Sequence, residues 1–137
     1  MDNIIFDKKW QDEHLIELKI SADSEFVSAY QRCYVQDTAL VEISEKIQNY
    51  IDNYNESCYL EFGHKEGNYT PAFSMNILPA DETGHMKVEV DIEIADNDTR
   101  IHRCCFYVKS ELGLIERLGI SLKGLVDAVE GEKVYLN

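Results

Sequence analysis

The chain has 137 residues, of which 45% are hydrophobic and 28% charged, and its 26 acidic and 13 basic residues give a formal charge of −13. This balance excludes a disordered chain, and the negative charge argues against binding to nucleic acid or to an anionic membrane surface. We expect one soluble, cytoplasmic domain over residues 1–137, because no apolar run approaches the roughly 20 residues of a membrane helix and the first residues lack the pattern of a secretion signal.

The first half of the chain predicts two strands followed by a helix. Residues 1–12 have no evident period, so we expect an irregular lead-in there. Alternating aliphatic residues predict a strand over 14–21, and aromatic and β-branched residues predict another over 26–35. Apolar residues then recur at helical spacing and predict a helix over 38–54.

The second half predicts a meander of strands and a second helix. The turn-forming segments between the strands contain Gly, Asn and Asp, as in hairpin loops. The predicted strands cover residues 58–63, 70–78, 85–95, 99–109 and, at the end of the chain, 133–136. A broad apolar stripe predicts a helix over 111–129, with a possible break at Gly119. The fold class expected is therefore α+β, a mostly antiparallel twisted sheet of six or seven strands with two helices packed mainly on one face.

The segment KVEVDIEI at 87–94 has the most regular alternation in the chain. Its aliphatic row is Val88, Val90, Ile92 and Ile94, and its acidic row is Glu89, Asp91 and Glu93. In a strand these two rows lie on opposite faces, so the acids should face solvent. With Glu61, and with Glu42 and Glu45 as further candidates, they could form a docking surface for a basic protein. A solvated face without a partner is the other interpretation.

The pairing of this strand with the next one depends on the loop between them. A three-residue loop over 96–98 places Arg103 opposite Asp91 and His102 opposite Ile92. A two-residue loop would place Arg103 opposite Ile92 in the core, which costs free energy, so the longer loop is preferred.

No phosphate-binding loop, nucleophile elbow, zinc-protease helix or EF-hand loop occurs in the sequence, and we predict no enzymatic activity, catalytic residue, cofactor or metal. His102 and Cys104 share one face of a strand and are the best pair for a metal, with His64, His85 or Cys58 as further ligands. Zinc needs four such donors, so a core histidine beside a core cysteine is preferred. A nucleophile pair would combine Cys104 or Cys105 with His102 or His85. The cysteines are predicted to be buried free thiols: Cys33, Cys58, Cys104 and Cys105.

The order of elements, together with the segments YLEFG, YTPAFSMNI, GHMKVEV and CCFYVKSELGLIERLGISLKGLV, resembles small bacterial immunity proteins of polymorphic and contact-dependent toxin systems, of the wall-associated toxin immunity type. The resemblance covers residues 13–136 and implies a non-enzymatic cytoplasmic binder of a cognate toxin. Such toxins are often basic nucleases. The alternatives are a small enzyme or metal-binding protein that uses His102, Cys104 and nearby carboxylates, and a homo-oligomeric domain joined through an exposed sheet edge.

Overall fold

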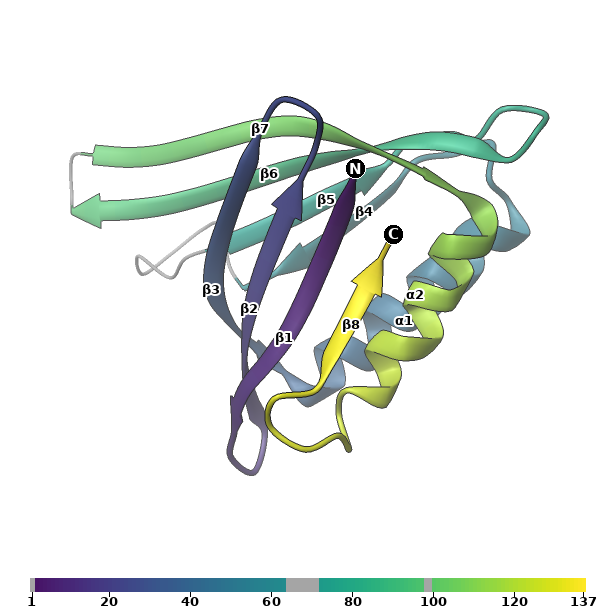
Figure 1. Cartoon of the computed structure of the whole chain (residues 1–137). Coiled ribbons are helices and arrows are strands. Elements are labelled where there is room, and N and C mark those ends of the chain that lie inside the picture. The colour runs from purple at the N-terminus through teal and green to yellow at the C-terminus, as the bar shows by residue number, and fades with distance from the viewer. Residues whose placement is uncertain (1, 64–71, 98–99) are drawn as a thin grey trace.

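The computed structural model describes residues 2–63, 72–97 and 100–137, which form two helices and two four-stranded antiparallel sheets (Figure 1). Sheet A has the order β3-β2-β1-β8, with β1 Asn3–Gln11, β2 Leu15–Asp23, β3 Ser28–Gln36 and β8 Lys133–Leu136. Sheet B has the order β4-β5-β6-β7, with β4 Cys58–Phe62, β5 Ala72–Ile77, β6 His85–Asn97 and β7 Arg100–Glu111. The helices are α1 Asp37–Asp52 and α2 Leu112–Gly124. The α+β class is confirmed, but the prediction of one sheet is wrong.

The N-terminal segment is a full strand of sheet A, so the predicted irregular lead-in is also wrong. Ile4 and Phe6 point inward and are fully buried. The pairing of β1 with β2 then shifts between Lys8 and Trp10, where a bulge adds one residue to β1. Because a bulge interrupts the two-residue period, the alternation of this strand is hard to recognise from the sequence.

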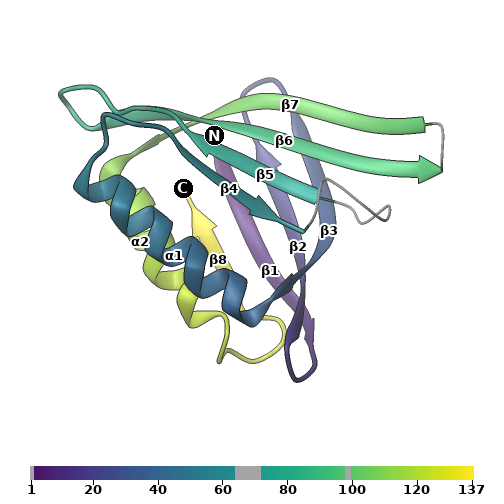
Figure 2. The same cartoon turned by 180° about the vertical axis from the view of Figure 1, so that it is seen from behind.

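Helix α1 separates the strands of the two sheets. Its 16 residues span roughly 24 Å, so the chain has moved away from the edge strand β3 before β4 begins. The next four strands pair among themselves, and β8 returns to pair with β1. Seen from behind, the strands of sheet B run across those of sheet A, and β6 and β7 extend past the end of β5 (Figure 2). The sheets approach each other through β3, which contacts β4, β5 and β6.

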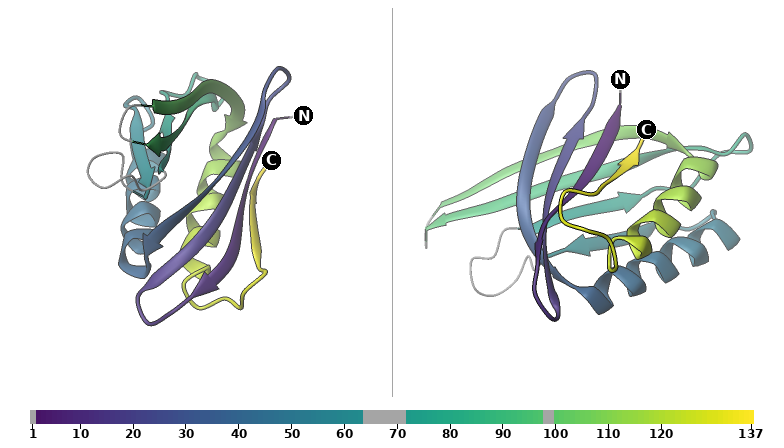
Figure 3. Two further views of the ribbon diagram at one scale, coloured as in Figure 1. Left: turned by 90° about the vertical axis from the view of Figure 1, so that its left-hand side faces the viewer. Right: turned by 60° about the horizontal axis from the view of Figure 1, so that its bottom comes forward.

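The helices pack against each other and fill the space between the two sheets, rather than covering one face of a single sheet (Figure 3). Helix α1 contacts β3 and β4, and α2 contacts β7 and β8. Gly119 lies where the helices meet, and a Cβ atom there would be only 2.8 Å from Cγ2 of Ile47. The helix is continuous through Gly119, so this glycine permits close packing and does not mark a break. Helix α2 ends at Gly124, five residues before the predicted end.

The core joins both sheets. The rings of Phe6, Phe62 and Phe73 contact one another with centroids 5.2 to 6.2 Å apart, which links sheet A to sheet B. Buried aliphatic side chains from both sheets and both helices belong to the same hydrophobic cluster. Because both sheets turn their inner faces toward this shared core, their outer faces point toward solvent.

A charged side chain, that of Lys8, lies inside this core. Lys8 is fully buried, and its ammonium donates hydrogen bonds to the carbonyl oxygens of Leu125 at 2.6 Å, Ala128 at 2.7 Å and Val126 at 3.3 Å. These carbonyls follow the C-terminal end of α2, where unpaired acceptors are expected. Burial lowers the pKa of Lys8, although nearby acidic residues act in the opposite direction.

Candidate functional site

The four predicted partner-binding carboxylates lie on the outer face of sheet B. Glu61 on β4 and Asp91 on β6 both lie opposite Ser74 of the strand between them, and Glu89 and Glu93 flank Asp91 along β6. We call this set, Glu61, Glu89, Asp91 and Glu93, the acidic face. The alternate residues of β6 point into the core, where Val88 and Val90 are 0% and Ile92 is 4% exposed. The predicted inward aliphatic row is therefore confirmed, but Asp91 is buried and does not face solvent as predicted.

Neighbouring side chains hold three of these carboxylates. Arg103 donates two hydrogen bonds to Asp91, from Nε to Oδ1 at 3.2 Å and from Nη2 to Oδ2 at 2.7 Å. The Tyr107 hydroxyl donates to Glu89 at 3.0 Å, and the Tyr59 hydroxyl donates to Glu61 at 2.8 Å. Hydrogen bonding to Asp91 raises the pKa of Arg103. Asp91 is only 6% exposed, whereas the three glutamates are half-buried.

The pairing of β6 with β7 differs by two residues from the prediction. Arg103 lies opposite Glu93, and Asp91 lies opposite Cys105, so the Arg103–Asp91 contact is diagonal. The strands reach Asn97 and Arg100, and the register shifts between Ala95 and Asn97. Because the register is irregular here, the aliphatic row of β6 still points inward although the connection to β7 is shorter than predicted. The predicted three-residue loop assumed a regular register.

One further prediction for these strands is wrong. His102 lies opposite Ile94 and is exposed, so it is not a core histidine. Cys104 lies opposite Ile92, is half-buried and packs against the hydrophobic core. Among the described residues, no group of three or more His, Cys, Asp or Glu side chains could hold a metal ion. His64, one of the further metal ligands considered, lies outside the described residues. Glu42 and Glu45 lie on α1, away from the acidic face.

All four cysteines are free thiols, but they are not all buried. Cys33 is buried, and desolvation raises its pKa to about 12. Cys105 is exposed beside the acidic face, where desolvation and the charges of Glu89 and Asp91 raise its pKa. A raised pKa disfavours the thiolate, so this environment does not activate Cys105 as a nucleophile.

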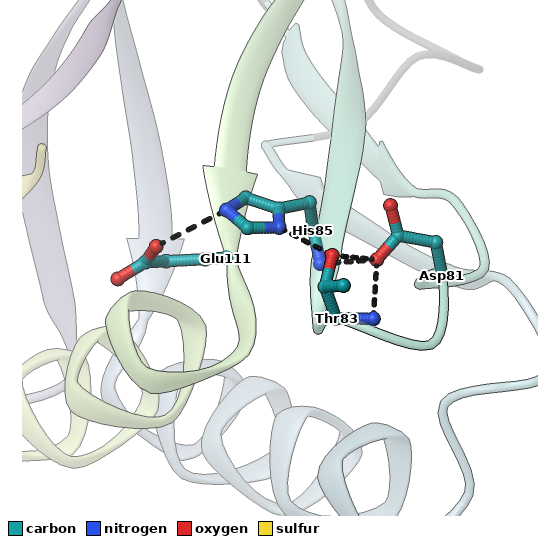
Figure 4. Close-up of polar contacts among 4 residues, drawn as sticks. All are labelled: Asp81, Thr83, His85 and Glu111. Atoms are coloured by element: carbon teal, nitrogen blue, oxygen red, sulfur yellow. Dashed lines mark hydrogen bonds and ion pairs between the residues drawn. The ribbon is translucent and has the colours of Figure 1, made fainter.

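The hairpin between β5 and β6 contains a polar cluster that the sequence analysis did not identify (Figure 4). Asp81 Oδ1 accepts hydrogen bonds from the Thr83 and His85 backbone amides, both at 2.9 Å, and from the Thr83 hydroxyl at 2.7 Å. The Thr83 hydroxyl also lies 2.8 Å from His85 Nδ1, and His85 Nε2 lies 3.7 Å from Glu111 Oε2. The spacing Asp-x-Thr-x-His could have indicated this turn.

This cluster resembles a relay between a hydroxyl and an imidazole, but its geometry favours a structural role. The Thr83 hydroxyl donates its one proton to Asp81, so the same proton is not shared with His85 Nδ1. The hydrogen bonds from His85 and Thr83 lower the pKa of Asp81. All four side chains are exposed, so the cluster closes a turn without forming an enclosed reaction site.

No family model, curated protein or solved structure matches the chain. No helix in the described ranges is both long enough and apolar enough to cross a membrane. The main feature of the candidate site is the acidic face with Tyr59 and Tyr107.

Proposed function

We propose that this chain is a non-enzymatic protein-binding module whose acidic face engages a basic protein, and that its partner is a bacterial toxin which it inhibits. The observation that carries the proposal is the arrangement of four carboxylates on the outer face of one sheet. A field of this sign accelerates the approach of a positively charged partner and opposes a negatively charged one.

The tyrosines of this face support a specific contact as well as steering. Tyr59 and Tyr107 are 48% and 49% exposed, and both hydroxyls hold carboxylates of the acidic face. Half-exposed tyrosines are frequent among the residues that dominate binding energy at protein interfaces. Side chains that are already held in place lose less conformational entropy when a partner binds.

The experiment measures association of the chain with a basic toxin domain chosen from the reading frame next to its own gene. We expect the association rate to fall with added salt, and the double variant Glu89→Lys with Glu93→Lys to weaken binding by about tenfold or more. The matched control is Glu42→Lys with Glu45→Lys, which makes the same change of charge on α1. Its affinity should stay close to that of the unmodified chain.

Two outcomes would contradict the proposal. Equal losses in the two double variants would mean that total charge alone attracts the partner. Binding that does not depend on salt would mean that the acidic face takes no part in the approach.

The exposed edge of sheet B favours a homo-oligomer as a second candidate. Strand β7 has 12 residues and forms this edge, and in the part of the chain that the structure describes no strand pairs with its outer side. An open edge can pair with a second chain, although charged residues such as Arg103 and Lys109 oppose that pairing. Sedimentation equilibrium over a range of concentrations separates a monomer from a dimer.

A further inference from the structure

Two lysines stand directly opposite each other at the helix end of the β6–β7 hairpin. Lys87 and Lys109 are a cross-strand pair on the outer face, so their Cβ atoms are about 5 Å apart. Both are exposed, and within the described ranges neither ammonium makes a hydrogen bond or a salt bridge. Like charges that face each other in this way destabilise a sheet.

A second pair of facing basic residues, on sheet A, differs because each of its members interacts with a neighbouring side chain. Lys19 and Arg32 are also directly opposite each other, on sheet A. There, Lys19 lies over the ring of Tyr30 at 4.7 Å, and Arg32 lies 3.9 Å from Glu17. Lys87 and Lys109 line a hollow together with Asp2 and Glu25, but among the described residues neither lysine forms an ion pair with these acids.

A second hollow, of about 480 Å³, adjoins the two lysines. Leu78, Pro79, Ala80 and Met86 supply its apolar lining, and Lys87 and Lys109 stand beside them. This volume lies in the range of small-molecule sites, which are mostly apolar with a few polar groups that orient the ligand.

The carboxylates closest to this hollow are already engaged. Asp81 contributes to the lining, but its Oδ1 atom accepts three hydrogen bonds from Thr83 and His85. Glu111 is directed toward His85. Asp2 binds the backbone amide of Lys109 and not its ammonium. None of these acids neutralises the lysine pair.

We propose that this hollow, the Lys87–Lys109 site, binds a carboxylate that carries a short aliphatic chain. The two ammonium groups would hold the carboxylate, and the chain would lie on Leu78 and Pro79. A free aliphatic acid has this chemistry, and so does the C-terminal residue of a peptide with an aliphatic side chain. This proposal is independent of the binding of a basic protein, because the two lysines attract a negatively charged ligand.

The test titrates the full-length chain with octanoate and follows backbone amide chemical shifts by NMR. We expect saturable shifts near Lys87 and Lys109 with a Kd on the order of 1 mM. The double variant Lys87→Met with Lys109→Met should weaken binding by about tenfold or more, because it removes both charged donors. The control, Lys46→Met with Lys123→Met, makes the same change of charge on the helices and should leave the affinity unchanged.

Further ligands distinguish a free aliphatic acid from a peptide C-terminus as the natural ligand. They also test whether the proposal is correct. An acetylated Ala-Leu dipeptide with a free C-terminus that binds more tightly than octanoate identifies a peptide C-terminus as the natural ligand. The reverse order identifies a free acid. Equal binding of octanamide, which has no charge, would refute the role of the lysines, as would the absence of saturable shifts. Thermal unfolding of the Lys87→Met, Lys109→Met variant verifies that it is folded.

Discussion

One row of residues on the outer face of sheet A is mainly basic, in contrast to the acidic face of sheet B. Across sheet A, cross-strand pairing aligns Arg32, Lys19, Asp7 and Lys133 in one row over all four strands. Sheet B presents the acidic face in the corresponding place. The formal net charge of −13 therefore does not describe each surface of the molecule. The register of each sheet decides which charged side chains lie on its outer face and so which of them a partner contacts.

Compensation also differs between the two faces. On sheet A, Asp7 accepts an ion pair from Lys9 at 2.9 Å, and it lies between two cations of the row. On sheet B, Arg103 is bound to Asp91, while tyrosine hydroxyls hold Glu61 and Glu89 without neutralising them. The acidic face consequently keeps more of its charge available to a partner.

The largest expected effect is on the free energy of unfolding, and it appears when the inward-pointing Lys8 and the outward-pointing Lys19 of sheet A are each replaced by methionine. Lys8→Met removes the donor to the carbonyls of Leu125 and Ala128 and should lower the free energy of unfolding by about 2–4 kcal/mol. Lys19→Met, on the solvent side, should change it by less than about 0.5 kcal/mol. Urea unfolding followed by circular dichroism measures both. Similar values for the two variants would show that the buried hydrogen bonds add no net stability.

The next effect concerns the helices that both sheets share. Gly119→Ala places a methyl group against Ile47 and should cost about 1–3 kcal/mol of stability. In the same helix Gly113→Ala meets no atom within 4 Å and should gain about 0.4–1 kcal/mol. Thermal unfolding of the pair tests the close packing of α1 on α2. A gain in both variants would mean that the helices can separate at no cost.

Within the acidic face, the buried carboxylate of Asp91 should matter more for stability than that of its half-buried neighbour Glu93. Asp91→Asn weakens the paired hydrogen bonds from Arg103 and should cost about 1–2 kcal/mol. Glu93→Gln should cost less than about 0.5 kcal/mol. A double-mutant cycle with Arg103→Gln isolates the interaction. No coupling between positions 91 and 103 would contradict the diagonal contact.

The smallest expected effect compares the hairpin aspartates of the two sheets. Asp12 accepts hydrogen bonds from the backbone amides of Leu15 and His14, and these lower its pKa, as the bonds from His85 and Thr83 do for Asp81. A lowered pKa in the folded state contributes stability above about pH 4, which is lost as the pH falls through the folded value. Asp12→Asn and Asp81→Asn should each reduce the acid dependence of unfolding, as pH titrations of stability would measure. If the stability of both variants fell as steeply at low pH as that of the unmodified chain, the two aspartates would make no such contribution.

The sequence by itself determined the local features of the molecule. The alternation of β6, the apolar stripe of α1 and the approximate positions of most strands follow from side-chain periods of two and 3.6 residues, which depend only on near neighbours in the chain. The outward direction of Glu89, Asp91 and Glu93 was predictable for the same reason. The acidic face could therefore be anticipated, except for its contacts with β7.

Tertiary structure alone decided which segments meet. Lys8 points inward because its carbonyl acceptors lie on a segment 117 residues away, and no local pattern indicates that contact. The division into two sheets, the diagonal contact of Arg103 with Asp91 and the opposition of Lys87 to Lys109 likewise depend on strand pairing and on a bulge. Pairing reflects the free energy of the whole core, to which distant residues contribute as much as adjacent ones.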